Sequence, residues 1–195
     1  MRLSLVLIAG PNGAGKSTLY ETRVASSFKG LFVNADLIQR DELRNPSMKA
    51  SYEAARIAEA RWIELIDARQ SFAAETVFSH PSKIDLIETA RARGYIVVVM
   101  HVGVDGPDLS VARVRLRTEE GGHDVPEDKI RARYDRSAPL IREAVLRADR
   151  GLDFDNSCLN APPRQMLVFA NGRLTRAEPV LPGWILKAYA DDLAF

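Results

Sequence analysis

Nine consecutive residues near the N-terminus have the types and the spacing that bind a phosphate chain. The segment 10–18 reads GPNGAGKST and matches the pattern G-x-x-x-x-G-K-[ST]. Glycines let backbone N–H groups point at phosphate oxygens, and a helix that begins at Lys16 adds its N-terminal partial charge. Lys16 would reach the β- and γ-phosphates, and the Ser17 hydroxyl would ligate Mg²⁺. The residues expected to contact ATP in this P-loop are Gly10, Pro11, Asn12, Gly13, Ala14, Gly15, Lys16, Ser17 and Thr18.

Two carboxylates follow apolar segments that are typical of parallel strands. Asp36 comes just after 31–34, and a carboxylate there can accept the proton of an acceptor hydroxyl. Asp36 could equally be the N-cap of the next helix. Arg40, four residues later, would share its helical face. Glu75 ends the segment 71–75 at a position typical of a carboxylate that holds Mg²⁺ directly or through water, although a Glu facing solvent is the alternative.

Arginines in the segment 108–137 could act on a transferred phosphoryl group. Arg113 and Arg117 are four residues apart and so share one face of a helix. A glycine pair at 121–122 separates this helix from the next, so we expect the two helices to form a lid that excludes water. A surface of ion pairs is the alternative. An acceptor base at Asp36 together with such a lid favours phosphoryl transfer to a hydroxyl over hydrolysis.

The elements that must position these residues alternate along the chain. Short β-branched segments and longer helical patterns indicate βαβ units and a parallel sheet flanked by helices. The expected strands are 3–9, 31–34, 71–75, 95–102, 152–155, 166–170 and 173–177. The expected helices are 16–27, one after Ser47, one after Pro81, 108–120 and 125–149.

Two local patterns add detail to this α/β prediction. Asn171-Gly172 predicts a type I′ turn between the last two strands. In the helix after Ser47, one apolar face is expected to hold Ala55, Ala58, Trp62 and Leu65. We therefore expect one P-loop kinase domain over residues 1–195. It would have a helical lid at 108–137 and a C-terminal hairpin and tail at 152–195.

Composition excludes several other classes of protein. The 195 residues include 27 Lys or Arg and 26 Asp or Glu, so the basic excess that nucleic-acid binders show is missing. A nucleic-acid partner is therefore not expected. Cys158 is the single cysteine and cannot form an internal disulfide, which favours a reducing, cytoplasmic location. The apolar segments 3–9 and 95–104 are shorter than the ~20 residues that cross a bilayer, so no membrane association is expected.

Four motifs occur in an order that resembles the zeta toxin family of P-loop kinases, in a compact form. The motifs are Ala9–Thr18, Val33–Asp36, Glu75–Ser79 and Gly121–Pro126. The resemblance implies a kinase that moves the ATP γ-phosphate to a sugar hydroxyl, with UDP-N-acetylglucosamine as the acceptor in well-known members. It also implies an antitoxin partner that obstructs the nucleotide site.

The resemblance assigns roles to individual residues. Lys16 and Ser17 would take the P-loop roles, Asp36 would be the acceptor base, Glu75 a functional carboxylate and Arg113 a lid arginine. The residues expected to bind the acceptor are Asp36, Arg40, Glu75, Thr76 and His123.

The chain also departs from the family pattern. Glu75-Thr76-Val77 replaces Glu-Gly-Thr, and His123 and Asp124 stand where a second lid arginine is expected. Arg117, or Arg133 from the following helix, could replace that arginine.

Two other functions stay open at this point. One is a nucleic-acid 5′-hydroxyl kinase, against which the near-neutral charge argues. The other is a nucleotide-dependent switch or partner-binding ATPase, for which the segment 181–186 could supply an apolar contact surface. More often, such a tail folds back onto the core.

Overall fold

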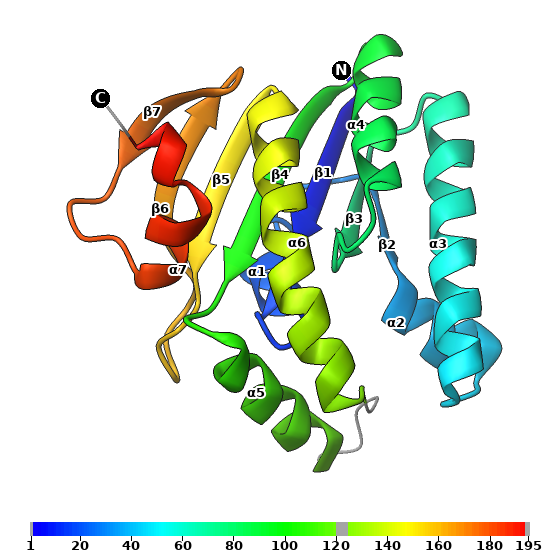
Figure 1. Ribbon diagram of the computed structural model, residues 1–195. Coiled ribbons are helices and arrows are strands. Elements are labelled where there is room, and N and C mark those ends of the chain that lie inside the picture. Colours follow the sequence, from blue (N-terminus) through cyan, green and yellow to red (C-terminus); the bar gives the residue numbers. More distant parts are fainter. Residues whose placement is uncertain (1, 120–124, 194–195) are drawn as a thin grey trace.

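The computed structural model describes residues 2–119 and 125–193, and within these ranges a seven-stranded sheet forms the centre of the molecule (Figure 1). The strands run in the order β2-β3-β1-β4-β5-β6-β7. The first five are parallel, and β6 runs antiparallel to both of its neighbours, β5 and β7. The strands are β1 (Ser4–Ala9), β2 (Leu31–Asn34), β3 (Phe72–Thr76), β4 (Ile96–Gly103), β5 (Arg150–Asp155), β6 (Arg164–Ala170) and β7 (Arg173–Ala177).

Helices cover both faces of this sheet. The α-helices are α1 (Lys16–Arg23), α2 (Ala35–Leu37), α3 (Met48–Asp67), α4 (Ser82–Ala92), α5 (Pro107–Glu119), α6 (Glu127–Arg147) and α7 (Gly183–Ala188). A π-helical turn (Ile38–Leu43) follows α2, and a 3₁₀ turn (Ala190–Asp192) follows α7. In Figure 1, α3, α4 and α6 lie in front of the sheet and α1 lies behind it.

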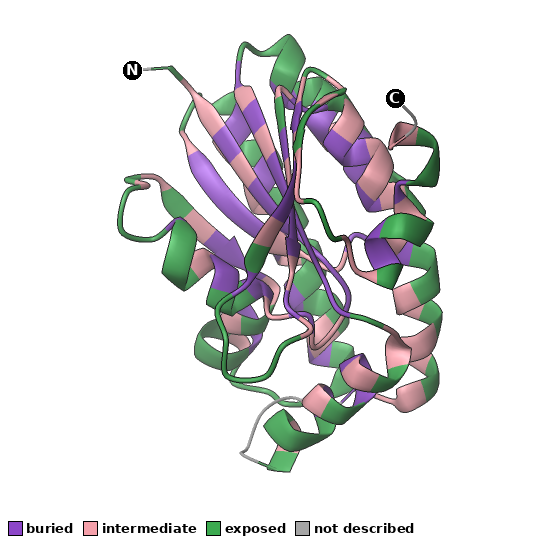
Figure 2. Cartoon of the chain, turned by 90° about the vertical axis from the view of Figure 1, so that its left-hand side faces the viewer, coloured by how far each residue is buried: buried purple, intermediate pink, exposed green. Residues whose placement is uncertain are grey.

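The two faces of β1 explain this layering, because successive side chains of a strand point to opposite sides. Leu5 and Leu7 are fully buried in the larger core cluster, which includes side chains of α3, α4 and α6. Ile8 belongs to the second cluster with Leu19 of α1. Strands buried on both faces are typical of parallel sheets covered by helices, and Figure 2 shows the sheet mostly buried and the outer helix surfaces exposed.

The predicted α/β fold is confirmed, with differences in several elements. The first helix ends at Arg23 rather than at residue 27, since the chain bends at Val24. In α3 the buried face is Ala50, Ala54, Ala58, Trp62 and Ile66. Of the predicted apolar face, Ala58 and Trp62 are buried, whereas Ala55 is exposed and Leu65 is half-buried. The buried residues of α3 recur every four residues rather than with the predicted spacing. The helix expected after Asp36 is present as the short α2, but its continuation as a π-helical turn was not predicted, nor was α7.

The C-terminal hairpin has the predicted turn. Asn171 and Gly172 both have positive φ, 49° and 75°, as a type I′ turn requires. The tail that follows packs back onto the sheet: Trp184, Ile185 and Tyr189 are buried. The Tyr189 hydroxyl lies 2.9 Å from Nδ1 of the buried His101 in β4. In the described ranges, every helix is too short or too polar to span a bilayer.

Candidate active site

The P-loop leaves the end of β1 and turns directly into α1. Gly13 and Gly15 have φ values of 74° and 87°, a region that residues with a Cβ rarely adopt. A Cβ on Gly13 would also lie 2.7 Å from the carbonyl oxygen of Ser110. Gly15 is the N-cap of α1, and no side chain caps this helix. The first N–H groups of α1 are therefore available to an anion.

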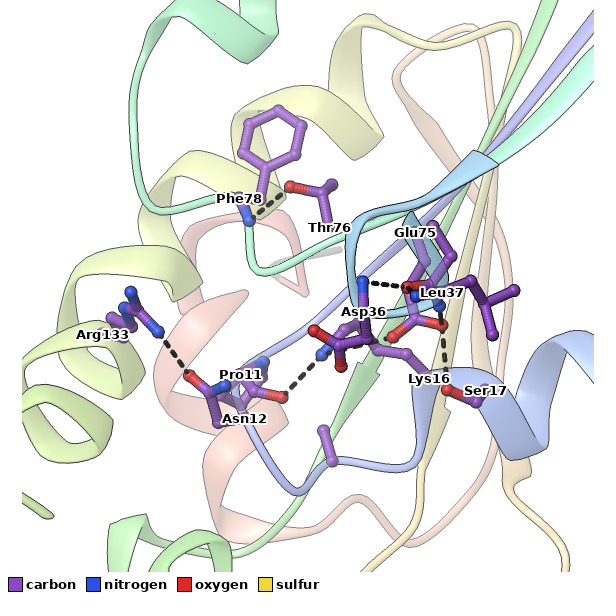
Figure 3. Close-up of polar contacts among 12 residues, drawn as sticks. Pro11, Asn12, Lys16, Ser17, Asp36, Leu37, Glu75, Thr76, Phe78 and Arg133 are labelled. Atoms are coloured by element: carbon purple, nitrogen blue, oxygen red, sulfur yellow. Dashed lines mark hydrogen bonds and ion pairs between the residues drawn. The ribbon is translucent and has the colours of Figure 1, made fainter. Parts of the chain in front are cut away.

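Lys16, Ser17 and Glu75 form the polar centre of the site (Figure 3). The Lys16 ammonium donates to the Pro11 carbonyl at 3.2 Å and lies 3.9 Å from Glu75 Oε1. The Ser17 hydroxyl donates to Glu75 Oε2 at 3.0 Å. The structure thus brings together the two residues predicted as metal ligands, Ser17 and Glu75, beside the predicted phosphate-binding lysine.

Burial sets the electrostatics of this centre. The side chains of Lys16 and Glu75 are 9% and 8% exposed. Loss of solvation lowers the pKa of Lys16 and raises the pKa of Glu75, and the attraction between the two groups opposes both shifts. These buried charges are costly unless they are compensated. A divalent cation would compensate Glu75, and a phosphate chain would compensate Lys16.

Asn34 is a site residue that sequence analysis did not single out. The register of β2 and β3 pairs Asn34 with Glu75, and the Asn34 amide donates to Glu75 Oε2 at 2.8 Å. Its Oδ1 accepts hydrogen bonds from the N–H groups of Asp36 at 2.7 Å and Leu37 at 3.3 Å. Asn34 is therefore the N-cap of α2, and the signal was an Asn at the end of a strand two residues before Asp36.

This capping settles the alternative interpretation of Asp36. The interpretation of Asp36 as the N-cap is wrong, because Asn34 has that role and Asp36 lies in the first turn of α2. The Asp36 side chain is 59% exposed, and its Oδ2 lies 4.0 Å from Nη1 of Arg117. A carboxylate in this position is accessible to a substrate hydroxyl.

A cavity of about 210 Å³ lies in front of these groups, between the carboxyl ends of the strands, α3 and α6. Its polar wall next to the P-loop includes Asn12, Lys16, Asn34, Asp36, Glu75, Thr76, Arg117 and Arg133. The predicted residues from three strand ends and the two helices α5 and α6 therefore meet around one space.

The opposite wall comes from α3 and α4 and was not predicted. Ala55 lines the cavity instead of the core, next to Glu59 and Trp62. Lys83 of α4 is almost buried, forms an ion pair with Glu59 and lies 4.9 Å from the centre of the Trp62 ring. The helical pattern indicated a buried stripe on α3 but could not show that its edge borders a cavity.

The arginines of α5 and α6 occupy two different environments. Arg117 and Arg133 line the cavity, and Arg133 Nη1 donates to Asn12 Oδ1 at 3.4 Å. Arg113 does not line this cavity, and its Cβ borders Gly13 of the P-loop. Burial lowers the pKa of Arg113, and the nearby Asp155 opposes that shift. Arg113 is thus separated from the cavity that Arg117 enters, although both come from α5.

Arg40 is not brought to the cavity. Its side chain is 70% exposed and pairs with the neighbouring Asp41 at 2.6 Å. The expected proximity to Asp36 assumed α-helical spacing, whereas Ile38–Leu43 forms a π-helical turn. A π-helix closes its hydrogen bonds over five residues instead of four, so a spacing of four no longer aligns two side chains.

Thr76 lies at the cavity wall, as predicted. Its hydroxyl oxygen accepts a hydrogen bond from the N–H of Phe78 at 3.0 Å, which stabilises the positive φ of Phe78. Thr76 therefore shapes the loop after β3. His123, which was expected to bind the acceptor, and the glycine pair of the lid lie outside the described residues.

The oxygen donors of this site suit a magnesium ion that takes most of its ligands from phosphate and water. No cluster of three or more His, Cys, Asp or Glu side chains in the described part of the chain could hold a metal ion by itself. Mg²⁺ in phosphate-transfer sites is usually held by one or two protein oxygens together with phosphate and water. Ser17 Oγ and Glu75 Oε2 provide two such oxygens.

A P-loop between β1 and α1, carboxylates at the ends of β2 and β3, and arginines from α5 and α6 define a P-loop kinase, a phosphotransferase with a hydroxyl acceptor. Residues 2–150 match the profile of the zeta toxin family. The chain belongs to this family.

Individual proteins are similar to this chain in sequence or in fold. An uncharacterized protein of Haemophilus influenzae is 28% identical over 135 residues, which are 69% of this chain and 94% of the relative. A chain of the PezAT chromosomal toxin-antitoxin system of Streptococcus pneumoniae superimposes with a TM-score of 0.59 and 16% identity, covering 80% of this chain and 69% of that one.

Two further structures share the fold. A chain of the AvrRxo1-ORF1:AvrRxo1-ORF2 complex gives a TM-score of 0.71 at 15% identity and matches 98% of this chain, which spans only 63% of that protein. Shikimate kinase from Acinetobacter baumannii in complex with shikimate gives 0.50 at 23% identity, over 72% of this chain and 79% of that one. At these identities the likeness concerns the fold.

Proposed function

We propose that the protein transfers the γ-phosphate of ATP, with Mg²⁺, to a hydroxyl of a small molecule, and that the acceptor is a UDP-activated amino sugar such as UDP-N-acetylglucosamine. One observation carries the transfer to a hydroxyl. The exposed carboxylate of Asp36 lines the same cavity as Lys16 and Glu75. A hydrolase needs only a positioned water, whereas this arrangement offers a base and space for an acceptor.

The chain's own residues account for each part of the reaction. The acceptor oxygen attacks the γ-phosphorus, its proton passes to a carboxylate oxygen of Asp36, and the bond to the bridging oxygen of ADP breaks. Lys16 leaves the Pro11 carbonyl to contact the phosphates. Arg117 and Arg133 stabilise the charge on the transferred group. Ser17 and Glu75 would hold Mg²⁺, which neutralises phosphate charge when bound.

The size of the cavity supports a small acceptor. Its volume of about 210 Å³ is below the ~300–1,000 Å³ of typical ligand pockets. It would hold the reacting sugar ring, with the remainder of a sugar nucleotide outside. The near-neutral chain, with 27 basic and 26 acidic residues, supports such an acceptor over a long polyanion. The single cysteine, Cys158, and the use of ATP fit a cytoplasmic enzyme.

An antitoxin partner is part of the proposal. The PezAT structure is described as a toxin-antitoxin system, and AvrRxo1-ORF1 is described in complex with AvrRxo1-ORF2. We infer that a partner protein of this kind controls the present enzyme by obstructing its nucleotide site.

A transfer assay tests the acceptor. The purified protein is incubated with Mg·ATP and one of three acceptors: UDP-N-acetylglucosamine, UDP-glucose or a 5′-hydroxyl oligonucleotide. Lys16→Ala serves as the blank, and mass spectrometry detects the phosphorylated product. We expect phosphorylation of the amino-sugar nucleotide. Phosphorylation of the oligonucleotide alone, or ATP hydrolysis that no acceptor changes, would contradict the proposal and support one of the alternatives.

A further inference from the structure

The peptide group between Ala14 and Gly15 is held from outside the P-loop. Nδ2 of Asn156 donates to the Ala14 carbonyl oxygen at 2.9 Å, and Asn156 is only 9% exposed. A Cβ added to Gly15 would lie 2.2 Å from the same Nδ2. Asn156 therefore packs directly against the loop at the residue before Lys16.

This hydrogen bond fixes the direction of the next N–H group. The C=O and N–H of a trans peptide point in opposite directions, and no peptide in the described ranges is cis. Because the Ala14 carbonyl faces Asn156, the Gly15 N–H faces the opposite side of the loop. It is not a donor in any of the protein hydrogen bonds described for residues 2–119 and 125–193. It is therefore available beside the free N–H groups at the start of α1.

Asn156 is itself held by the sheet and the C-terminal tail. Its backbone N–H donates to the Gly103 carbonyl at the end of β4, at 2.9 Å. The preceding Asp155 accepts a hydrogen bond from the Trp184 indole at 2.8 Å. Trp184 packs over Gly103, where an added Cβ would lie 2.7 Å from the ring. A continuous set of contacts therefore joins α7 to the P-loop.

We propose that Asn156 is a positioning residue for nucleotide binding: it orients the Ala14–Gly15 peptide so that the Gly15 N–H donates to the phosphate chain. Residues 151–195, which lie beyond the family match, hold Asn156 in place through Asp155 and Trp184. This inference rests on the proposed use of ATP, but it requires no knowledge of the acceptor.

The test compares two variants of Asn156 by calorimetric titration with Mg·ATP. Asn156→Ala removes the donor, and we expect the Kd for ATP to rise about fivefold. Asn156→Asp keeps the shape but sets a carboxylate against the Ala14 carbonyl, and we expect a rise of more than about tenfold. The matched control is Leu167→Ala, a fully buried position in β6, which should lower the melting temperature without changing the Kd.

A spectroscopic measurement separates orientation from general loss of structure. In protein labelled with ¹⁵N-glycine, Mg·ADP should shift the Gly15 amide signal strongly, and Asn156→Ala should reduce this shift while Gly94 and Gly106 stay unchanged. Trp184→Phe, which removes the indole donor and part of the ring that packs over Gly103, should give an intermediate ATP Kd. It remains informative if Asn156→Asp does not fold. Equal ATP Kd values for wild type and Asn156→Ala, or an equal loss in Leu167→Ala, would overturn the inference.

The outcomes also distinguish this inference from the proposed function. If the wild type binds ATP but phosphorylates no acceptor, the proposed function fails while the Asn156 comparison still decides the inference. If the sugar nucleotide is phosphorylated and Asn156→Ala binds ATP normally, only the inference fails.

Discussion

Asn34 makes two different contributions that substitutions can separate. Its Oδ1 caps α2, and its amide donates to the buried Glu75. Losing an N-cap costs about 1 kcal/mol, and losing a hydrogen bond to a charged group costs about 1.5–3 kcal/mol. Since Glu75 keeps its hydrogen bond from Ser17, we expect Asn34→Ala to lower the free energy of unfolding by about 3 kcal/mol. Asn34→Asp keeps the capping oxygen but replaces the amide donor with a second carboxylate.

The pH dependence of Asn34→Asp follows from the pKa of Glu75. Burial raises the pKa of Glu75 in the folded protein, and a neighbouring carboxylate raises it further. A raised folded pKa means that stability is greatest below the unfolded pKa and is lost as pH rises through the folded pKa. The destabilisation by Asn34→Asp should therefore be larger at about pH 7.5 than at about pH 5.

Urea unfolding monitored by tryptophan fluorescence measures both effects. A loss of about 3 kcal/mol corresponds to a midpoint shift of about 1 M urea for a chain of this size. The reasoning would be refuted if Asn34→Ala shifted the midpoint by less than about 0.2 M, or if Asn34→Asp were equally destabilised at both pH values.

Three further predictions address the arginines, the metal site and the tail. Arg117→Ala should lower kcat about 10²- to 10³-fold. Arg115→Ala, which removes an exposed ion pair with Glu127, should leave kcat unchanged. Equal kinetics for the two variants would contradict the placement of Arg117. Glu75→Gln should raise the Mg²⁺ concentration needed for half-maximal turnover about ten- to a hundredfold, and an unchanged magnesium titration would remove Glu75 from the metal site. Tyr189→Phe deletes the hydroxyl beside His101. It should lower the free energy of unfolding, measured by thermal melting, by about 1–2 kcal/mol without changing kcat. An unchanged melting curve would show that this contact does not stabilise the tail.

Local patterns predicted the parts of the site that depend on one segment. The P-loop, the strand before it and the helix after it lie within one continuous stretch, so their geometry follows from neighbouring residues. Glu75 and Asp36 were found because parallel strands end at the same edge of a sheet. The contact between Asn34 and Glu75 depends on the register of β2 and β3, which no single segment determines.

Other residues depended on tertiary packing that sequence spacing does not encode. Arg40 failed to reach the cavity because the chain adopts a π-helical turn at Ile38–Leu43. Spacing placed Arg113 and Arg117 together on one face of α5, but only Arg117 lines the cavity. Ala55 fits a helical apolar stripe as well as Ala54 does, and only the position of α3 against the sheet decides which is buried. Asn156 reaches the P-loop from 142 positions away.

The central claim is that Asp36 is the base that accepts the proton of the acceptor hydroxyl. Its most direct test measures phosphoryl transfer to UDP-N-acetylglucosamine and the ATP Kd in Asp36→Asn. The control is Asp41→Asn, an exposed carboxylate in the adjacent turn that pairs with Arg40. We predict that Asp36→Asn loses at least about 10²-fold in transfer rate with an unchanged ATP Kd, while Asp41→Asn keeps both values. Transfer by Asp36→Asn at the wild-type rate would contradict the account.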